Sequence, residues 1–170
     1  NLCMKKSIFK RLSKDIQPIE YKITLKPDLE SHVFDGEEFL TVKITKATKK
    51  ITLHSVDLDI VYVSLNKGKK STLLDITYNK EQETITLVSK EIIPEGVYTI
   101  YFIWKGILSS SMRGFYKSEY VVDDKTHTMA TTQFEATDAR RCIPCFDEPA
   151  QKAIFNVNLV VPLGKQAISN

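Results

Sequence analysis

Residues 94–104 read PEGVYTIYFIW, and this stretch indicates the class of the fold. Pro94, Glu95 and Gly96 have the composition of a turn, and the eight residues after them are rich in β-branched and aromatic side chains. Such side chains favour strands because they pack well on a pleated surface. We therefore predict a strand over residues 97–104, and its partners must come from the flanking sequence.

Apolar and polar residues alternate in several segments on both sides of this stretch. Tyr21, Ile23 and Leu25 alternate with two lysines and a threonine, which is typical of a half-buried strand. Further strands are predicted at residues 40–44, 51–54, 60–65, 74–78, 84–88 and 155–161. Many short strands separated by turns predict an all-β fold, an antiparallel β-sandwich or curved sheet.

Two segments have weak helical character. Residues 8–12 could form a short helix, and residues 137–141 could form one turn, with Thr137 or Asp138 as its cap and Pro144 after its end. Neither segment is long enough to change the class of the fold. The chain is thus expected to contain at most short helical turns.

Length and composition exclude several classes of protein. The 170 residues carry 24 basic and 21 acidic side chains, a net charge of +3, which gives no reason to expect nucleic acid as a partner. No apolar run approaches the roughly 20 residues that span a membrane, so no membrane partner is expected. Three cysteines and the absence of an Asn-x-Ser/Thr acceptor favour a reducing, cytoplasmic location.

The familiar signatures of a self-contained active site are missing. The three histidines, His32, His54 and His127, do not form the HExxH pattern of zinc peptidases and are expected on the surface or in loops. Cys142 and Cys145 form a CxxC without a second ligand pair, so two small thiols in a turn are the favoured interpretation. A disulfide between them under oxidation is left open. We expect no catalytic residue and no metal ligand in this chain.

Gln133, Phe134 and Glu135 form the most informative tripeptide. On a strand, Gln133 and Glu135 would point to one side and Phe134 to the other, into the core. A carboxylate in that position could bind a ligand ammonium group through charge-assisted hydrogen bonds. Spacing alone, however, favours a solvated strand face.

The segment around this tripeptide resembles the N-terminal domain of zinc aminopeptidases of the aminopeptidase N family, most closely the puromycin-sensitive type. The resemblance rests on ordered segments: Thr132–Gln–Phe–Glu–Ala–Thr–Asp–Ala–Arg140–Arg, Pro144–Cys–Phe–Asp–Glu–Pro149–Ala–Gln–Lys–Ala153–Ile–Phe155, Pro18–Ile–Glu–Tyr21, Phe34–Asp–Gly36, Leu53–His54, Gly96–Val–Tyr98 and Gly114–Phe–Tyr116–Lys–Ser118. They cover residues 11–170, which we expect to be one N-terminal β domain. Residues 1–10 are expected to lie outside it, as a disordered or non-native segment.

The resemblance implies a saddle-shaped β domain beside a catalytic domain. It implies that Glu135 binds the free α-amino group of a peptide substrate and that Gln133 helps to line the first side-chain pocket. Asp138, Arg140, Asp147 and Glu148 are expected to be structural, with a buried or partly buried ion pair among them.

The departures from the family define what this chain is expected to lack. The HExxH motif and the GAMEN loop are absent, so the catalytic domain and its zinc are expected in a longer parent protein. The isolated chain is predicted to bind no catalytic zinc and to be inactive. The alternative is a catalytically inert scaffold or protein-interaction module. Retention of Gln133 and Glu135 favours the enzyme, because a scaffold has no need of an amine anchor.

Overall fold

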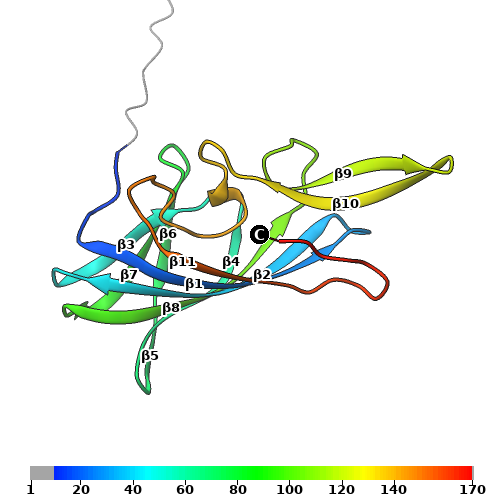
Figure 1. Ribbon diagram of the computed structural model, residues 1–170. Coiled ribbons are helices and arrows are strands. Elements are labelled where there is room, and N and C mark those ends of the chain that lie inside the picture. The colour runs from blue at the N-terminus through cyan, green and yellow to red at the C-terminus, as the bar shows by residue number, and fades with distance from the viewer. Residues whose placement is uncertain (1–9, 170) are drawn as a thin grey trace, which may run out of the picture.

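The computed structural model describes residues 10–169, which are built mainly of strands (Figure 1). Eleven strands and one 3₁₀ helix follow one another within these residues: β1 (Ile16–Asp28), β2 (Val33–Ile44), β3 (Thr48–His54), β4 (Asp59–Lys67), β5 (Lys70–Leu73), β6 (Asp75–Asn79), β7 (Thr84–Ile93), β8 (Gly96–Ile107), β9 (Gly114–Val122), β10 (Lys125–Gln133), η1 (Ala139–Arg141) and β11 (Ile154–Leu159). The all-β prediction is confirmed. The predicted segment 1–10 lies outside the described residues, except for Lys10.

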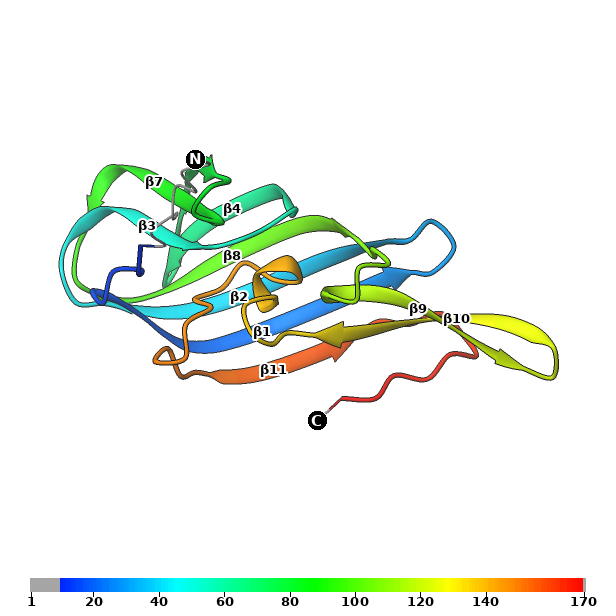
Figure 2. The ribbon, with the colours of Figure 1, turned by 90° about the horizontal axis from the view of Figure 1, so that it is seen from above.

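The strands form two sheets and a separate hairpin. A six-stranded sheet has the order β11-β1-β2-β8-β4-β5, and a three-stranded sheet has the order β3-β7-β6. Strands β9 and β10 form a two-stranded sheet of their own, which extends beyond the large sheet (Figures 1 and 2). The long strands β1, β2 and β8 are curved, in agreement with the expected saddle shape.

One neighbouring pair departs from the antiparallel prediction. Strand β11 runs parallel to β1, with Tyr21 opposite Phe155, and these two rings stack at 4.6 Å between their centroids. A parallel pair needs a long connection between its strands. Residues 134–153 lead from the hairpin across one face of the large sheet before β11 begins (Figure 2). Period-two alternation in the sequence carries no information on strand direction, so this feature was missed.

The two sheets enclose a common hydrophobic core. Leu40 and Ile100 from the large sheet and Leu53 and Ile85 from the small one are fully buried in it. The alternation in the sequence selects these inward-facing residues, and burying each removes an apolar side chain from water, worth roughly 1.5–3 kcal/mol. The core therefore fixes the large sheet as a rigid base for the loop that follows the hairpin.

Trp104 of β8 attaches that loop to the large sheet. Its indole is fully buried, and its Nε1 donates a hydrogen bond of 3.1 Å to the carbonyl of Cys142. Gly36 lies opposite Trp104 in the β2–β8 register, and a Cβ atom there would overlap the indole ring. Glycine at position 36 thus makes room for the side chain that holds the loop.

The helical predictions are partly confirmed. Within the predicted turn at 137–141, Ala139–Arg141 form the 3₁₀ helix η1. Asp138 occupies the cap position, but its side chain makes no capping hydrogen bond. Of the other segment, residues 8 and 9 lie outside the described residues, and residues 10–12 are not helical.

Candidate functional site

The predicted anchor lies at the end of the hairpin and not within a strand. Strand β10 ends at Gln133, and Phe134 and Glu135 continue into a turn in which the Asp138 amide donates to the Phe134 carbonyl at 2.9 Å. The peptide bond between Glu135 and Ala136 is cis. Gln133 and Glu135 are both exposed, but the strand alternation that was expected to align them stops at Gln133.

The prediction that Phe134 belongs to the core is wrong. Its side chain is 39% exposed, because the strand that would have turned it inward has already ended. The aromatic residue that enters the core here is Phe115 of β9, which lies edge-on to Phe34 at 5.1 Å. The base of the hairpin is therefore fixed through β9.

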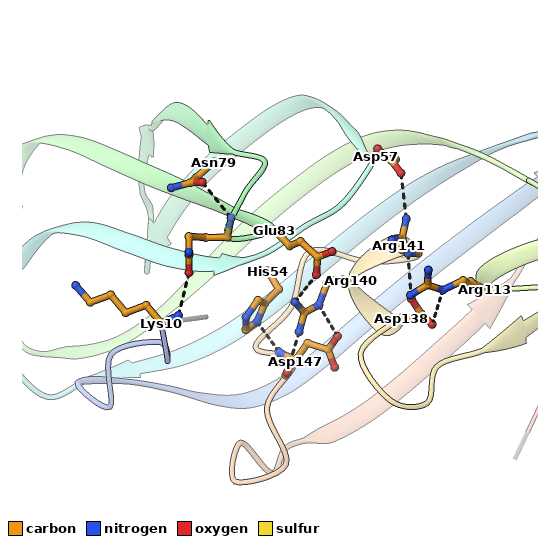
Figure 3. Close-up of polar contacts among 11 residues, drawn as sticks. Lys10, His54, Asp57, Asn79, Glu83, Arg113, Asp138, Arg140, Arg141 and Asp147 are labelled. Carbon is orange, nitrogen blue, oxygen red and sulfur yellow. Dashed lines mark hydrogen bonds and ion pairs between the residues drawn. The ribbon is translucent and has the colours of Figure 1, made fainter. Parts of the chain in front are cut away.

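Asp138 connects the turn at residues 134–138, here called the anchor turn, to the segments before β9 and at the end of η1. Its buried carboxylate accepts hydrogen bonds from Nε of Arg113 at 3.1 Å and from Nε of Arg141 at 3.0 Å (Figure 3). Burial alone would raise the pKa of Asp138, but these two hydrogen bonds and the two positive charges bring it below its ordinary value. Because Arg113 precedes β9 and Arg141 ends η1, the ion pairs join the two ends of the turn region.

Gly114 allows the close approach on which this arrangement depends. It begins β9 with a φ of +69°, and a Cβ atom there would lie 2.6 Å from Cβ of Arg141. A positive φ costs glycine little, whereas other residues are strained by it. Gly114 also pairs with Gln133 across the hairpin, so the glycine lies beside the end of β10.

Arg140 forms the second ion-pair cluster. Its buried guanidinium donates from Nη1 to Glu83 at 2.8 Å and from Nε to Asp147 at 2.9 Å (Figure 3). Glu148, the next residue, accepts a hydrogen bond from the Leu12 amide at 2.8 Å. The predicted structural roles of Asp138, Arg140, Asp147 and Glu148 are confirmed by these contacts.

His54 corrects the prediction that all three histidines lie on the surface or in loops. It ends β3 with 6% exposure, and its Nδ1 accepts a hydrogen bond of 3.2 Å from the Asp147 amide. Burial, together with the nearby charge of Arg140, lowers the pKa of His54. A neutral imidazole is required for Nδ1 to accept this bond, so His54 serves as a structural acceptor.

Cys142 and Cys145 lie in the loop after η1 and are both buried as free thiols. Cys145 forms a two-residue bridge with His54, in which each amide donates to the other's carbonyl, at 2.8 and 3.0 Å. Burial raises the pKa of both thiols, so they lack the thiolate character of a redox CxxC. The expectation of two structural thiols agrees with this environment.

Glu38 is a buried acid that the sequence analysis missed. It lies on the inner face of β2 with no exposed surface, and neither carboxylate oxygen has a hydrogen-bond partner within residues 10–169. Burial raises the pKa of Glu38 well above its ordinary value. The signal was present in the sequence, because Phe34, Gly36 and Leu40 share its period-two face.

The described part of the chain contains no set of side chains arranged to bind a metal ion. Within residues 10–169, no group of three or more His, Cys, Asp and Glu side chains is placed to hold one. The donors named above are occupied by arginines and backbone amides, so they do not fit the zinc that the family resemblance implies. No helix among these residues is long and apolar enough to cross a membrane.

The structure is a β domain in which the exposed residue Glu135 lies on a turn beside the six-stranded sheet. The sequence matches the Peptidase M1 N-terminal domain family over residues 17–170, and the chain belongs to this family. It is 38% identical over 165 residues to Aminopeptidase M1 of Arabidopsis thaliana and 37% identical over 167 residues to Puromycin-sensitive aminopeptidase of Caenorhabditis elegans. The matches cover 94% and 95% of this chain but only 19% and 17% of those relatives.

A bacterial relative is matched over a larger share of its length. Aminopeptidase N of Acetobacter pasteurianus is 32% identical over 161 residues, which are 94% of this chain and 44% of that protein. The chain therefore spans less than half the length of each of these three relatives. The expected family is confirmed, and the activity of a whole aminopeptidase is a matter for proposal.

Proposed function

We propose that this chain is the non-catalytic N-terminal domain of a zinc aminopeptidase that removes single residues from peptide N-termini. Its contribution is Glu135, which binds the α-amino group of the substrate, with Gln133 beside the first side-chain pocket. The partners are the N-terminus of a peptide and the catalytic domain of the same polypeptide. The relatives whose names identify them as aminopeptidases support this class of activity.

The state of the Glu135 carboxylate is the observation that carries the proposal. Four acids lie between residues 134 and 149, and three of them, Asp138, Asp147 and Glu148, accept hydrogen bonds from arginines or a backbone amide. Glu135 is exposed and has no partner within residues 10–169. A carboxylate left free on a turn that ion pairs hold in place is available for a cation from outside the domain.

An ammonium group is the cation that suits an exopeptidase. Such an enzyme must identify the first residue of a peptide, and the positively charged N-terminus marks that residue. Charge-assisted hydrogen bonds to a fixed carboxylate position the substrate so that its first peptide bond reaches the reacting groups. The zinc of the full-length enzyme has no ligand set in residues 10–169, so no step through it is assigned to this chain.

The ion pairs around the turn support its role as a positioning element. Asp138 pairs with Arg113, just before β9, and Arg140 pairs with Glu83, just before β7. The free cysteines support the proposed cytoplasmic location, because buried thiols persist in a reducing compartment. The proposed domain comprises residues 11–170, of which the family match covers 17–170.

The test is the full-length protein with the substitution Glu135→Gln. Loss of a charged hydrogen bond is worth about 1.5–3 kcal/mol, so kcat/KM for aminoacyl fluorogenic substrates should fall roughly tenfold to a hundredfold. Glu119→Gln removes an equal charge from an exposed position on the same hairpin and should leave kcat/KM unchanged. The isolated 170-residue chain should hydrolyse none of these substrates, with or without added zinc.

Three results would contradict the proposal. One is equal kcat/KM for the Glu135→Gln variant and the parent protein. Another is zinc-dependent turnover by the isolated chain. A full-length protein with no aminopeptidase activity would favour the inert scaffold instead.

A further inference from the structure

The β9–β10 hairpin has two faces, and the strand register assigns each residue to one of them. Gln133 shares its face with Thr131 and Met129 of β10, because side chains two residues apart point the same way. Across the hairpin, Tyr116 lies opposite Thr131 and Ser118 lies opposite Met129. The face that begins at Gln133 thus continues outward as a series of cross-strand pairs.

The packing of Phe115 shows which face this is. Phe115 pairs with Thr132, and its buried ring packs on Phe34 of the large sheet. The face with Phe115 and Thr132 is therefore directed toward the large sheet at the base of the hairpin. The face with Gln133, Thr131 and Tyr116 is the opposite one, directed away from that sheet (Figure 2 shows the hairpin extending from it).

The side chains on the Gln133 face near the anchor turn share one property, which is that they are uncharged. The amide of Gln133 is followed by the hydroxyl of Thr131, the phenol of Tyr116, the hydroxyl of Ser118 and the thioether of Met129. None of these side chains carries a charge at pH 7. The two charged residues of the inner hairpin, Lys117 and Glu119, belong by alternation to the other face.

We infer that the pair Thr131–Tyr116 extends the first side-chain pocket beyond Gln133 and makes Thr131 a specificity-determining residue for peptides with a large uncharged N-terminal side chain. This inference rests on the proposed function of Glu135. Thr131 lies about 7 Å farther along the strand than Gln133 on this face, so only a long first side chain of the substrate is expected to reach it.

The hairpin offers a matched pair of threonines for the experiment. In the full-length protein, Thr131→Leu adds bulk on the Gln133 face, and Thr132→Leu adds the same bulk on the opposite face. The readout is the ratio of kcat/KM for a phenylalanyl substrate to that for an alanyl substrate. Both values come from one preparation, so a partly folded variant leaves the ratio unaffected.

Thr131→Leu should lower the ratio about tenfold, the size of effect that one or two methylene groups have in an apolar pocket. Thr131→Ala should not lower the ratio, and Thr132→Leu should leave it within twofold of the parent protein. Equal ratios for the two leucine variants would overturn the inference. If Glu135→Gln still lowers kcat/KM for both substrates in that case, the proposed anchor stands without the extended pocket. If Glu135→Gln has no effect, the proposed function and this inference both fail.

Discussion

The body of the domain and its β9–β10 hairpin are stabilised in different ways. In the body, two sheets bury side chains such as Leu40 and Ile85 in a common core. The hairpin is a two-stranded ribbon, and its outer half exposes Tyr120, Val121 and Val122. An isolated hairpin is only marginally stable in water. The comparison teaches that rigidity is concentrated at the hairpin base, where Phe115 and the ion pairs of Asp138 hold the turn that presents Glu135.

The largest effect on the free energy of unfolding is expected at Arg140, whose ion pairs join the body to the segment after the anchor turn. Arg140→Ala leaves the carboxylates of Glu83 and Asp147 without their buried cation, and breaking such a pair costs about 3–5 kcal/mol. The free energy of unfolding, measured with a chemical denaturant, should fall by this amount. Lys105→Ala breaks a solvent-exposed pair with Asp35 and should cost much less than Arg140→Ala. Equal costs for the two variants would show that the loop is not held by Arg140.

An intermediate effect of opposite sign is expected inside the body, at Glu38. Replacing the buried, unpartnered carboxyl by the apolar side chain in Glu38→Val should raise the free energy of unfolding by about 1–3 kcal/mol. The control is Glu38→Gln, which keeps a buried polar group and should be less stable than the valine variant. A valine variant less stable than the parent would show that Glu38 has a partner that stabilises it.

The same residue gives the body a pH dependence with a defined sign. The raised pKa of Glu38 in the folded state means that the unfolded chain loses this proton first, near its ordinary value of 4.5. This group therefore destabilises the fold progressively as pH rises from that value toward the raised pKa. Both Glu38 variants should lack this decline, which unfolding curves at several pH values would show as a difference from the parent.

The smallest effect is expected at the end of the hairpin. Val121 is 67% exposed, so Val121→Lys should change the free energy of unfolding by less than about 0.5 kcal/mol. It lies on the face opposite Gln133, and selectivity between substrates should also be unchanged. A loss of more than about 1 kcal/mol in unfolding experiments would mean that the outer hairpin is stabilised as the body is.

Much of the body could be predicted from the sequence because one side of each strand is buried. The alternation of Tyr21, Ile23 and Leu25 reflects a core on one face only, and the structure places all three inside. The same logic fails for β9 and β10, whose outer residues are exposed or only half-buried on both faces and so show no apolar period. The hairpin that leads to the candidate site was therefore the part of the fold that the sequence pattern predicted least well.

The sequence supplied the residues proposed for the candidate site but not their geometry. Glu135 and Gln133 came from the family resemblance, and their exposure agrees with it. Beyond the end of β10 at Gln133, the turn is closed by the bond between the Asp138 amide and the Phe134 carbonyl, and Arg113, 22 residues before Glu135, binds the Asp138 carboxylate. His54 was misplaced for a similar reason, because its partner Asp147 lies 93 residues away. The alternation of apolar and polar residues reports neither the local turn after Gln133 nor a partner as distant as Asp147.

The parallel pairing of β11 with β1 has a consequence for how the domain is synthesised. The first strand of the large sheet is covered on its outer edge by the last, with Glu20 opposite Ile154 and Leu25 opposite Leu159. On a ribosome, the backbone amides and carbonyls along that edge of β1 have no β11 to pair with until some 130 further residues have been translated. Such long-range closure slows folding and leaves an open strand edge exposed to other nascent chains. The interval between the emergence of Glu20 and that of Leu159 is thus the period in which this edge of β1 lacks its native partner strand.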